Sequence, residues 1–267
     1  TYIVTLTVTD TNGCQDIFID SNVTVYGEPI SYFTAADVCE GDTTYFTNVT
    51  PNMVSYVWDF DDGTGGVGID PQHHYATYGA YNVTLTITDN NGCVGDTTMT
   101  VFVRPPPVAD FIWSDACLGD DMLFTDSTNY NVDIISGAPF AWAWDFGDSI
   151  GVSNVTNPSY NYGTSGLYST TLIVTDSYGC QDTVSHDVEV WPLPVTAFTV
   201  DSVCITYTSN FITTPSPGAV SWAWEFGDGA IANEITPNTN HVYDSVGNYT
   251  VILVVTDTNG CQDTATV

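Results

Sequence analysis

An acidic turn recurs three times along the chain and is the first candidate for chemistry. Each turn follows a Trp, an acidic residue and a Phe. Side-chain oxygens gathered at a turn suit Ca²⁺, so calcium binding is one interpretation. The alternative is that the first acid bonds the turn backbone and a Gly supplies a positive φ. The candidate ligands are Asp59, Asp61 and Asp62 in the first turn, Asp145 and Asp148 in the second, and Glu225 and Asp228 in the third.

Seven cysteines recur at regular positions and form the second candidate. Regular cysteines predict disulfides and an oxidising compartment. A zinc site is not expected, because the chain has no Cys-x-x-Cys and its four histidines do not recur at metal-ligand spacing. One set of cysteines lies early in each repeat (Cys39, Cys117, Cys204), and the other lies in a late Gly-Cys step (Cys14, Cys93, Cys180, Cys261).

Several functions are excluded by what the chain lacks. No Ser/His/Asp set repeats and there is no Gly-x-Ser-x-Gly, so we expect no enzyme activity. With 32 acidic residues, one Arg, no Lys and a net charge of −31, the chain has no basic face for nucleic acid. Its apolar runs are strand-sized, so we expect no membrane insertion. An acidic surface favours solubility and protects exposed sheet edges.

The elements that position these residues are predicted to be β-strands. Alternation with period two over 2–9 and 80–88, with Asn-Gly turns, indicates hairpins, and no stretch has helical periodicity. Further strands are expected over 30–35, 43–48, 53–60 and 97–103. The predicted domains are 30–104, 108–191 with an insertion at 130–139, and 195–267, hereafter the first, second and third repeats, preceded by a C-terminal half-domain at 1–29.

Short strands at this spacing predict an all-β fold of tandem immunoglobulin-like sandwiches, expected to form an elongated rod. A Trp in the third strand of each repeat would be buried between the sheets. A Tyr at the start of the sixth strand would form a tyrosine corner with nearby backbone. The predicted core residues are Trp58, Trp144, Trp224, Tyr81, Tyr168 and Tyr249.

These residues carry a resemblance. Tyr56–Phe60, His73 to Tyr75, and Gly79 to Leu85 look like the PKD domain, and the Gly-Cys endings resemble PKD arrays of giant surface proteins of Bacteroidota. The resemblance implies an Ig-like sandwich, an extracellular place and adhesive or spacer work. The chain departs from the family pattern where Asp61 and Ser149 replace Gly and Glu225 replaces Asp, which indicates a tolerant structural turn.

Two disulfide arrangements are open. Pairing within a repeat would join Cys39–Cys93, Cys117–Cys180 and Cys204–Cys261. In an Ig-like sandwich, however, the first loop and last hairpin lie at opposite ends, about 20–25 Å apart, and a disulfide needs Cα atoms within about 7 Å. This distance favours pairs between repeats, Cys39–Cys180 and Cys117–Cys261, with Cys14, Cys93 and Cys204 bonded outside this segment.

The half-domain at 1–29 lacks partner strands, so these would precede residue 1 or come from another molecule. Residues 1–20 match 248–267, as expected of one period of a long fibre. Asn-x-Ser/Thr occurs at Asn22, Asn48, Asn82, Asn154 and Asn248, and Asp-Thr steps at 42–44, 96–98, 182–184 and 263–265 resemble an O-glycosylation signal. Glycosylation is therefore a hypothesis.

Our main hypothesis is a structural segment of an extracellular rod or filament on a bacterial cell surface. It would serve adhesion or act as a spacer, with self-association as its main partnership. The alternative is a glycan- or protein-binding accessory module of a secreted adhesin or hydrolase, which would present exposed aromatic side chains to cell-surface glycans. Trp113, Trp142 and Trp222 are the candidates, although Trp142 and Trp222 lie two residues before a core Trp and could be core themselves.

Overall fold

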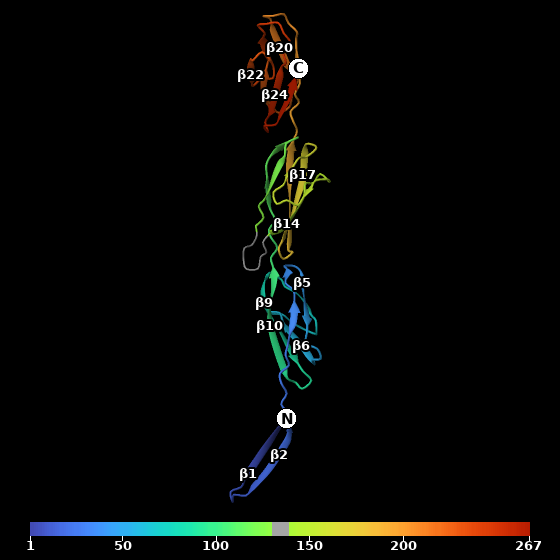
Figure 1. Cartoon of the computed structure of the whole chain (residues 1–267), viewed down its shortest axis with the longest axis vertical. Coiled ribbons are helices and arrows are strands. Elements are labelled where there is room, and N and C mark those ends of the chain that lie inside the picture. Colours follow the sequence, from blue (N-terminus) through green and yellow to red (C-terminus); the bar gives the residue numbers. More distant parts are fainter. Residues whose placement is uncertain (130–138) are drawn as a thin grey trace. The chain divides into compact units, whose positions relative to one another are not determined.

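The computed structural model describes residues 1–129 and 139–267, and every regular element in these ranges is a β-strand (Figure 1). The strands are rich in Thr, Val, Ile and aromatic residues, which suit a half-buried pleated surface. The first compact part contains Thr1–Pro107 together with Thr175–Gln181, and the second contains Val108–Asn129, Phe140–Val174 and Asp182–Val267. The insertion predicted at 130–139 lies, up to residue 138, outside the described residues.

The first repeat is a two-sheet sandwich. One sheet has the order β3-β5-β8 and the other β4-β10-β9-β6-β7. All pairs are antiparallel except β4 with the end of β10, where Val38 and Cys39 pair with Val103 and Arg104. The strands are β3 (Phe33–Ala35), β4 (Val38–Cys39), β5 (Thr43–Asn48), β6 (Ser55–Asp59), β7 (Gly65–Val67), β8 (Gln72–His74), β9 (Gly79–Thr88) and β10 (Val94–Arg104).

The second repeat has the same two sheets, β11-β13-β16 and β12-β18-β17-β14-β15. In the third, the larger sheet has the order β22-β21-β24-β25, and no strand corresponds to β4 or β12. The strands are β11 (Phe111–Trp113), β12 (Ala116–Cys117), β13 (Met122–Asp126), β14 (Pro139–Asp145), β15 (Val152–Ser153), β16 (Ser159–Tyr160), β17 (Gly166–Asp176), β18 (Gln181–Trp191), β19 (Phe198–Val200), β20 (Thr208–Thr213), β21 (Ala219–Glu225), β22 (Ile231–Glu234), β23 (Thr239–Val242), β24 (Ile252–Asp257) and β25 (Gln262–Thr266).

Each repeat has a core centred on its tryptophan. Trp58, Trp144 and Trp224 are at most 2% exposed. Each contacts two Phe rings of the opposite sheet; the Trp58 ring, for example, lies 4.9 Å from Phe33 and 5.4 Å from Phe46. Aromatic rings dominate core energetics because each buries a large area, so this cluster anchors the sandwich. The indole Nε1 of Trp58 and Trp144 donates to a carbonyl, 2.9 Å in both cases.

The strands differ in detail from the sequence-based expectation. A short strand after each acidic turn (β7, β15, β22) was not predicted, because two to four residues carry too little alternation to be recognised. The Tyr249 segment is not part of a sixth strand, since β24 begins at Ile252. In the first repeat the sixth strand, β9, begins at Gly79 and pairs with β10 over its whole length.

The N-terminal segment is a two-stranded hairpin of β1 (Tyr2–Thr9) and β2 (Gln15–Val23) (Figure 1). Among the described residues no second sheet covers it, and Leu6 and Phe18 are 58% and 67% exposed. A two-stranded hairpin is marginally stable alone, so its apolar side chains need a cover.

Candidate functional site: the acidic turns and the inter-repeat disulfides

The first acid of the turn bonds the turn backbone in two of the three repeats. Asp59 Oδ1 accepts the Asp61 N–H at 3.0 Å, and Asp145 Oδ1 accepts the Gly147 N–H at 2.9 Å. Asp61 has a φ of 64°, close to the 79° of Gly147, so an Asp holds a left-handed conformation there. The Asp61 carboxylate accepts the backbone N–H of Asn82 at 2.8 Å. This hydrogen bond offsets part of the free-energy cost of the left-handed backbone conformation.

The last acid of the turn binds an aromatic side chain. Asp62 contacts His73 Nε2 at 2.7 Å, and Asp228 contacts His241 Nε2 at 2.7 Å. In the second repeat Tyr160 takes the place of the His and donates to Asp148 at 2.5 Å.

The same three rings stack on the Phe of the turn motif. The ring centroids of His73, Tyr160 and His241 lie 4.1–4.3 Å from Phe60, Phe146 and Phe226 respectively, nearly parallel. The carboxylate therefore fixes a ring that closes the core beside the turn.

These hydrogen bonds shift the pKa values of the turn carboxyl groups and of Tyr160. The hydrogen bond from His241, followed by that from the Ala230 N–H, lowers the pKa of the Asp228 carboxyl. Burial raises the pKa of Asp62, but hydrogen bonds from Thr64 and His73 outweigh it and lower the pKa overall. The hydrogen bond to Asp148 raises the pKa of Tyr160 to about 12. The Asp62 and Asp228 carboxylates are thus stabilised in their ionised form by the protein's own donors.

Within residues 1–129 and 139–267, no group of three or more His, Cys, Asp or Glu side chains is arranged to hold a metal ion. Backbone N–H groups of the turns donate hydrogen bonds to five of these carboxylates, those of Asp59, Asp62, Asp145, Asp148 and Asp228. Calcium binding at Asp59, Asp61, Asp62, Asp145, Asp148, Glu225 and Asp228 stays a prediction.

The predicted tyrosine corners are present in all three repeats. Tyr81 and Tyr168 donate to the carbonyls of Thr77 and Thr164 at 2.7 Å. Tyr249 donates to the Ser245 carbonyl at 2.8 Å. The three rings are half-buried and each stacks on a second Tyr of its repeat, so they fasten the rim of the core.

Two disulfides join successive repeats. Cys39 bonds Cys180 with a Cα–Cα distance of 5.5 Å, and Cys117 bonds Cys261 at 5.6 Å. Both are the pairs that strand length favours, in which the first loop of one repeat meets the last hairpin of the next. The alternative pairing within a repeat is wrong, since four of its six cysteines are engaged in these bonds.

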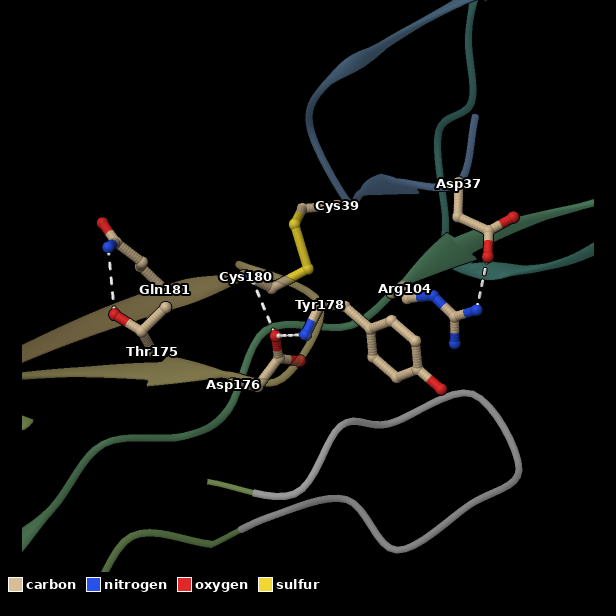
Figure 2. Close-up of a disulfide and its surroundings, with 8 residues drawn as sticks. All are labelled: Asp37, Cys39, Arg104, Thr175, Asp176, Tyr178, Cys180 and Gln181. Atoms are coloured by element: carbon tan, nitrogen blue, oxygen red, sulfur yellow. Dashed lines mark hydrogen bonds and ion pairs between the residues drawn. A yellow bond between two sulfur atoms is a disulfide. The ribbon is translucent and has the colours of Figure 1, made fainter. Parts of the chain in front are cut away.

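Cys39–Cys180 lies beside the chain's one Arg (Figure 2). Arg104 is 6% exposed, and its Nη2 lies 2.5 Å from Asp37 Oδ2. Its guanidinium carbon lies 3.5 Å from the centre of the Tyr178 ring, on the hairpin that carries Cys180. Because Tyr178 and Cys180 lie on the same hairpin, Arg104 and the disulfide both hold that hairpin. A desolvated cation–π contact of this kind is worth about 2 kcal/mol.

The hairpins that carry the Gly-Cys steps are built alike. Asp176 Oδ1 accepts the N–H groups of Tyr178 and Cys180, both at 2.9 Å. Asp257 does the same for Asn259 and Cys261. The bonded cysteines Cys180 and Cys261 are 1% exposed. Cys14, Cys93 and Cys204 are unbonded, and their predicted partners outside this segment remain a prediction.

The aromatic candidates for a binding surface separate into two kinds. Trp222 is 8% exposed and belongs to the core, and Trp142 is half-buried with its Nε1 donating to Asp126 at 2.9 Å. Trp113 is 38% exposed, and its ring lies 5.6 Å from that of His186, which contacts Asp110 at 2.8 Å. Among these three, Trp113 alone offers a substantially exposed indole.

The profile of the PKD domain matches residues 28–103, 104–190 and 194–267. The chain belongs to the PKD domain family. These bounds lie close to the repeats predicted from the sequence. PKD domains are non-catalytic modules, although they occur in enzymes, and within the described residues no helix is long and apolar enough to cross a membrane.

The curated relatives are enzymes matched over short stretches. A microbial collagenase of Vibrio alginolyticus is 44% identical over 57 residues, which cover 21% of this chain and 7% of the relative. Collagenase ColQ1 of Bacillus cereus is 41% identical over 52 residues, 20% of this chain and 5% of the relative. The chain thus spans a small part of these relatives' length. PKD domains therefore occur as accessory modules of collagenases.

Solved PKD domains are also similar. The PKD1 domain of the Vibrio cholerae metalloprotease PrtV is 30% identical over 32% of this chain and 98% of that domain, with a TM-score of 0.29. The PKD1 domain of Vibrio anguillarum Epp is 28% identical over 33% of this chain and 98% of that domain, with a TM-score of 0.30. These four relatives come from Vibrio and Bacillus species, so an origin in Bacteroidota stays a prediction.

Sequence reasoning missed two features of the site. The stacking of His73, Tyr160 and His241 on the turn Phe was not foreseen, although each of the three lies two residues before a Tyr. The contact of Arg104 with Tyr178 was also missed, although a single cation among 32 acidic residues was a signal that its position matters.

Proposed function

We propose that this chain is a non-catalytic structural segment of an extracellular bacterial protein, in which linked PKD domains act as a spacer or as part of an adhesive filament. The observation that carries this proposal is the pair of disulfides that join each repeat to the next. The disulfides and the family together indicate an extracellular location. Attachment to a cell surface and assembly with copies of itself are the further parts of the proposal.

The physical basis is restriction of bending. Three prolines, 105–107, separate the first two repeats and allow rotation at their ends. A disulfide 141 residues apart in sequence adds a second connection between the same two repeats. Two connections leave less freedom than one, so tension on the chain would be shared by the linker and the disulfide. This suits a spacer more than a freely jointed string.

A distance measurement between the first two repeats tests the proposal. Dyes coupled through non-natural amino acids at exposed Tyr45 and Leu167 should give a narrow transfer-efficiency distribution in the parent chain. Replacing Cys39 and Cys180 by Ser should broaden it. The matched control, in which Cys117 and Cys261 are replaced, should leave it narrow. Equal widths in all three proteins would reject a restraining role for the disulfides.

Glycan binding is the second candidate, favoured by Trp113. Its exposed indole lies beside His186 and Asp110, and a sugar ring could stack on the indole while polar groups receive its hydroxyls. The first and third repeats have Ala35 and Val200 at the corresponding strand position, so they serve as internal controls. A glycan array should show binding that Trp113→Ala abolishes. If the parent chain binds no glycan, the glycan-binding role is rejected and only the structural role remains.

Calcium binding by the acidic turns is a separate proposal with its own test. Oxygen ligands at the acidic turns of an extracellular module would bind Ca²⁺ with a dissociation constant of about 0.1–1 mM. Calcium should then raise the unfolding temperature over that in chelator, and Asp62→Asn, Asp148→Asn and Asp228→Asn together should remove the difference. An unfolding temperature that calcium does not change would exclude the site. Intact-mass measurement of natural material would likewise decide glycosylation.

A further inference from the structure

Three side chains that distinguish the second repeat from the other two lie together in its sandwich. Trp113 belongs to β11, Asp110 directly precedes that strand, and His186 belongs to β18 of the opposite sheet. The His186 ring lies 5.6 Å from that of Trp113, and its Nε2 lies 2.8 Å from Asp110 Oδ1. Three separate departures from the repeat therefore meet at one place. The corresponding residues are Tyr32, Ala35 and Met99 in the first repeat and Ala197, Val200 and Val267 in the third.

The backbone next to Asp110 is fixed by a further side chain. Asp182 Oδ2, on β18, accepts the Ala109 N–H at 2.8 Å, which ties the residue before Asp110 to the opposite sheet. The first repeat has Gly95 at the position of Asp182, and a Cβ there would lie 2.0 Å from the Pro29 carbonyl oxygen. The chain thus approaches its first strand differently in the two repeats, and in the second it places Asp110 beside His186.

The Asp110 carboxylate is ionised and has an oxygen to offer. Its Oδ1 accepts the Phe111 N–H at 2.9 Å and contacts His186, whereas no donor among residues 1–129 and 139–267 bonds its Oδ2. The hydrogen bonds from His186 and from the Phe111 N–H lower the pKa of the Asp110 carboxyl, so it stays charged in slightly acidic solution. The Asp110 side chain is 55% exposed, so a ligand can reach that oxygen.

The charge of the chain favours a cationic ligand at this place. The sequence has no Lys, its one Arg is 6% exposed, and the net charge is −31. Such a chain attracts cations and repels anions. The face of an exposed indole also attracts a cation, through the quadrupole of the ring. A ligand with an apolar face and a positive charge therefore suits Trp113 and Asp110 better than a neutral or an acidic ligand.

We propose that Trp113, His186 and Asp110 form a subsite for a hexosamine, a sugar that carries a free ammonium group. A sugar ring stacks on the indole, and the ammonium of that ring or of the adjacent one donates to Asp110 Oδ2. His186 lies between the indole and the carboxylate and contacts both, so linked sugar rings can span the two. The inference rests on the glycan-binding candidate proposed above and names its ligand class.

Two matched oligosaccharides test the selectivity for charge. Short oligomers of glucosamine and of N-acetylglucosamine share the same rings, but only the first carries ammonium groups. Each is titrated into the ¹⁵N-labelled chain in slightly acidic buffer, in which the amines are protonated. Moderate salt screens the diffuse attraction between the acidic chain and any cation. The indole N–H signal that is missing in Trp113→Ala is assigned to Trp113, and its shift reports binding at the subsite.

The parent chain should bind the glucosamine oligomer about fivefold more tightly than the N-acetylglucosamine oligomer, the upper range for an exposed ion pair. Asp110→Asn keeps the acceptor for the Phe111 N–H but removes the charge, so it should abolish most of this preference. Asp187→Asn is the matched control. It also removes one charge, from an exposed residue on the other face of β18, and should leave the preference unchanged.

Equal preferences in the Asp110→Asn and Asp187→Asn variants would overturn the inference, because the attraction would then be diffuse. If the N-acetylglucosamine oligomer shifts the Trp113 signal and is bound as tightly as the glucosamine oligomer, only the selectivity for charge is rejected and the glycan-binding candidate stands. If neither oligomer shifts the signal, the glycan-binding candidate fails and this inference fails with it. The structural role is judged separately, by the dye-distance measurement.

Discussion

Ser149, in the acidic turn of the second repeat, has a φ of 72°, a backbone conformation that suits glycine. Gly229 holds the same position in the third repeat with a φ of 95° and open space around it. We expect Ser149→Gly to stabilise the second repeat by about 1 kcal/mol, the usual cost of a left-handed non-glycine residue. Gly229→Ser is the matched control and should destabilise by a similar amount. Denaturant unfolding followed by Trp fluorescence measures both, and changes of the same sign would contradict the explanation.

Asp228 predicts how acid acts on the third repeat. Its pKa is lower in the folded than in the unfolded chain, owing to His241 and the Ala230 N–H. The folded state therefore gains stability above the unfolded pKa, and this gain is lost as pH falls through the folded pKa. Asp228→Asn should lower the unfolding temperature at pH 7, and the difference from the parent should vanish at the lowest pH values. A difference that is constant with pH would show that the carboxylate charge is irrelevant.

At the scale of elements, the strand that carries the core Trp holds the two sheets together. Trp144 is 2% exposed and contacts Phe111 and Phe124 of the opposite sheet. Trp144→Ala should destabilise the second repeat by about 3–5 kcal/mol through loss of buried area and a residual cavity. Trp113→Ala, at a site 38% exposed, should cost less than about 1 kcal/mol. Equal losses in chemical denaturation would mean that the core is not centred on Trp144.

At the scale of the whole molecule, we expect the disulfides to determine which repeats unfold together. The Cys39–Cys180 bond and the Arg104–Tyr178 contact link the first repeat to the last hairpin of the second. Calorimetry of the parent should show coupled unfolding of these two repeats. C39S/C180S should separate them into two transitions, because domains joined only by a linker unfold independently. C117S/C261S should keep the coupling of the first two repeats; if it separates them as well, the disulfides act indirectly.

The amino-acid sequence by itself determined the repeat, the strand content and the core. Each Trp-Asp/Glu-Phe step, each Gly-x-Tyr step and each Asn-Gly turn depends on local periodicity and turn chemistry, which a linear sequence displays directly. The tyrosine corners of Tyr81, Tyr168 and Tyr249 were predictable for the same reason, since the hydroxyl bonds a carbonyl only four residues away.

Only the tertiary structure decided the contacts between distant segments. Strand length favoured Cys39–Cys180 over Cys39–Cys93, but the bond joins residues 141 apart, and no local pattern fixes which loop meets which hairpin. The stacking of Arg104 on Tyr178 depends on the same meeting of repeats. The sequence likewise left open whether Asp62 and Asp228 bind a metal or accept hydrogen bonds in the turn, and calcium binding there stays a prediction. Their use as partners of His73 and His241 follows from the sheet pairing that brings those rings onto Phe60 and Phe226.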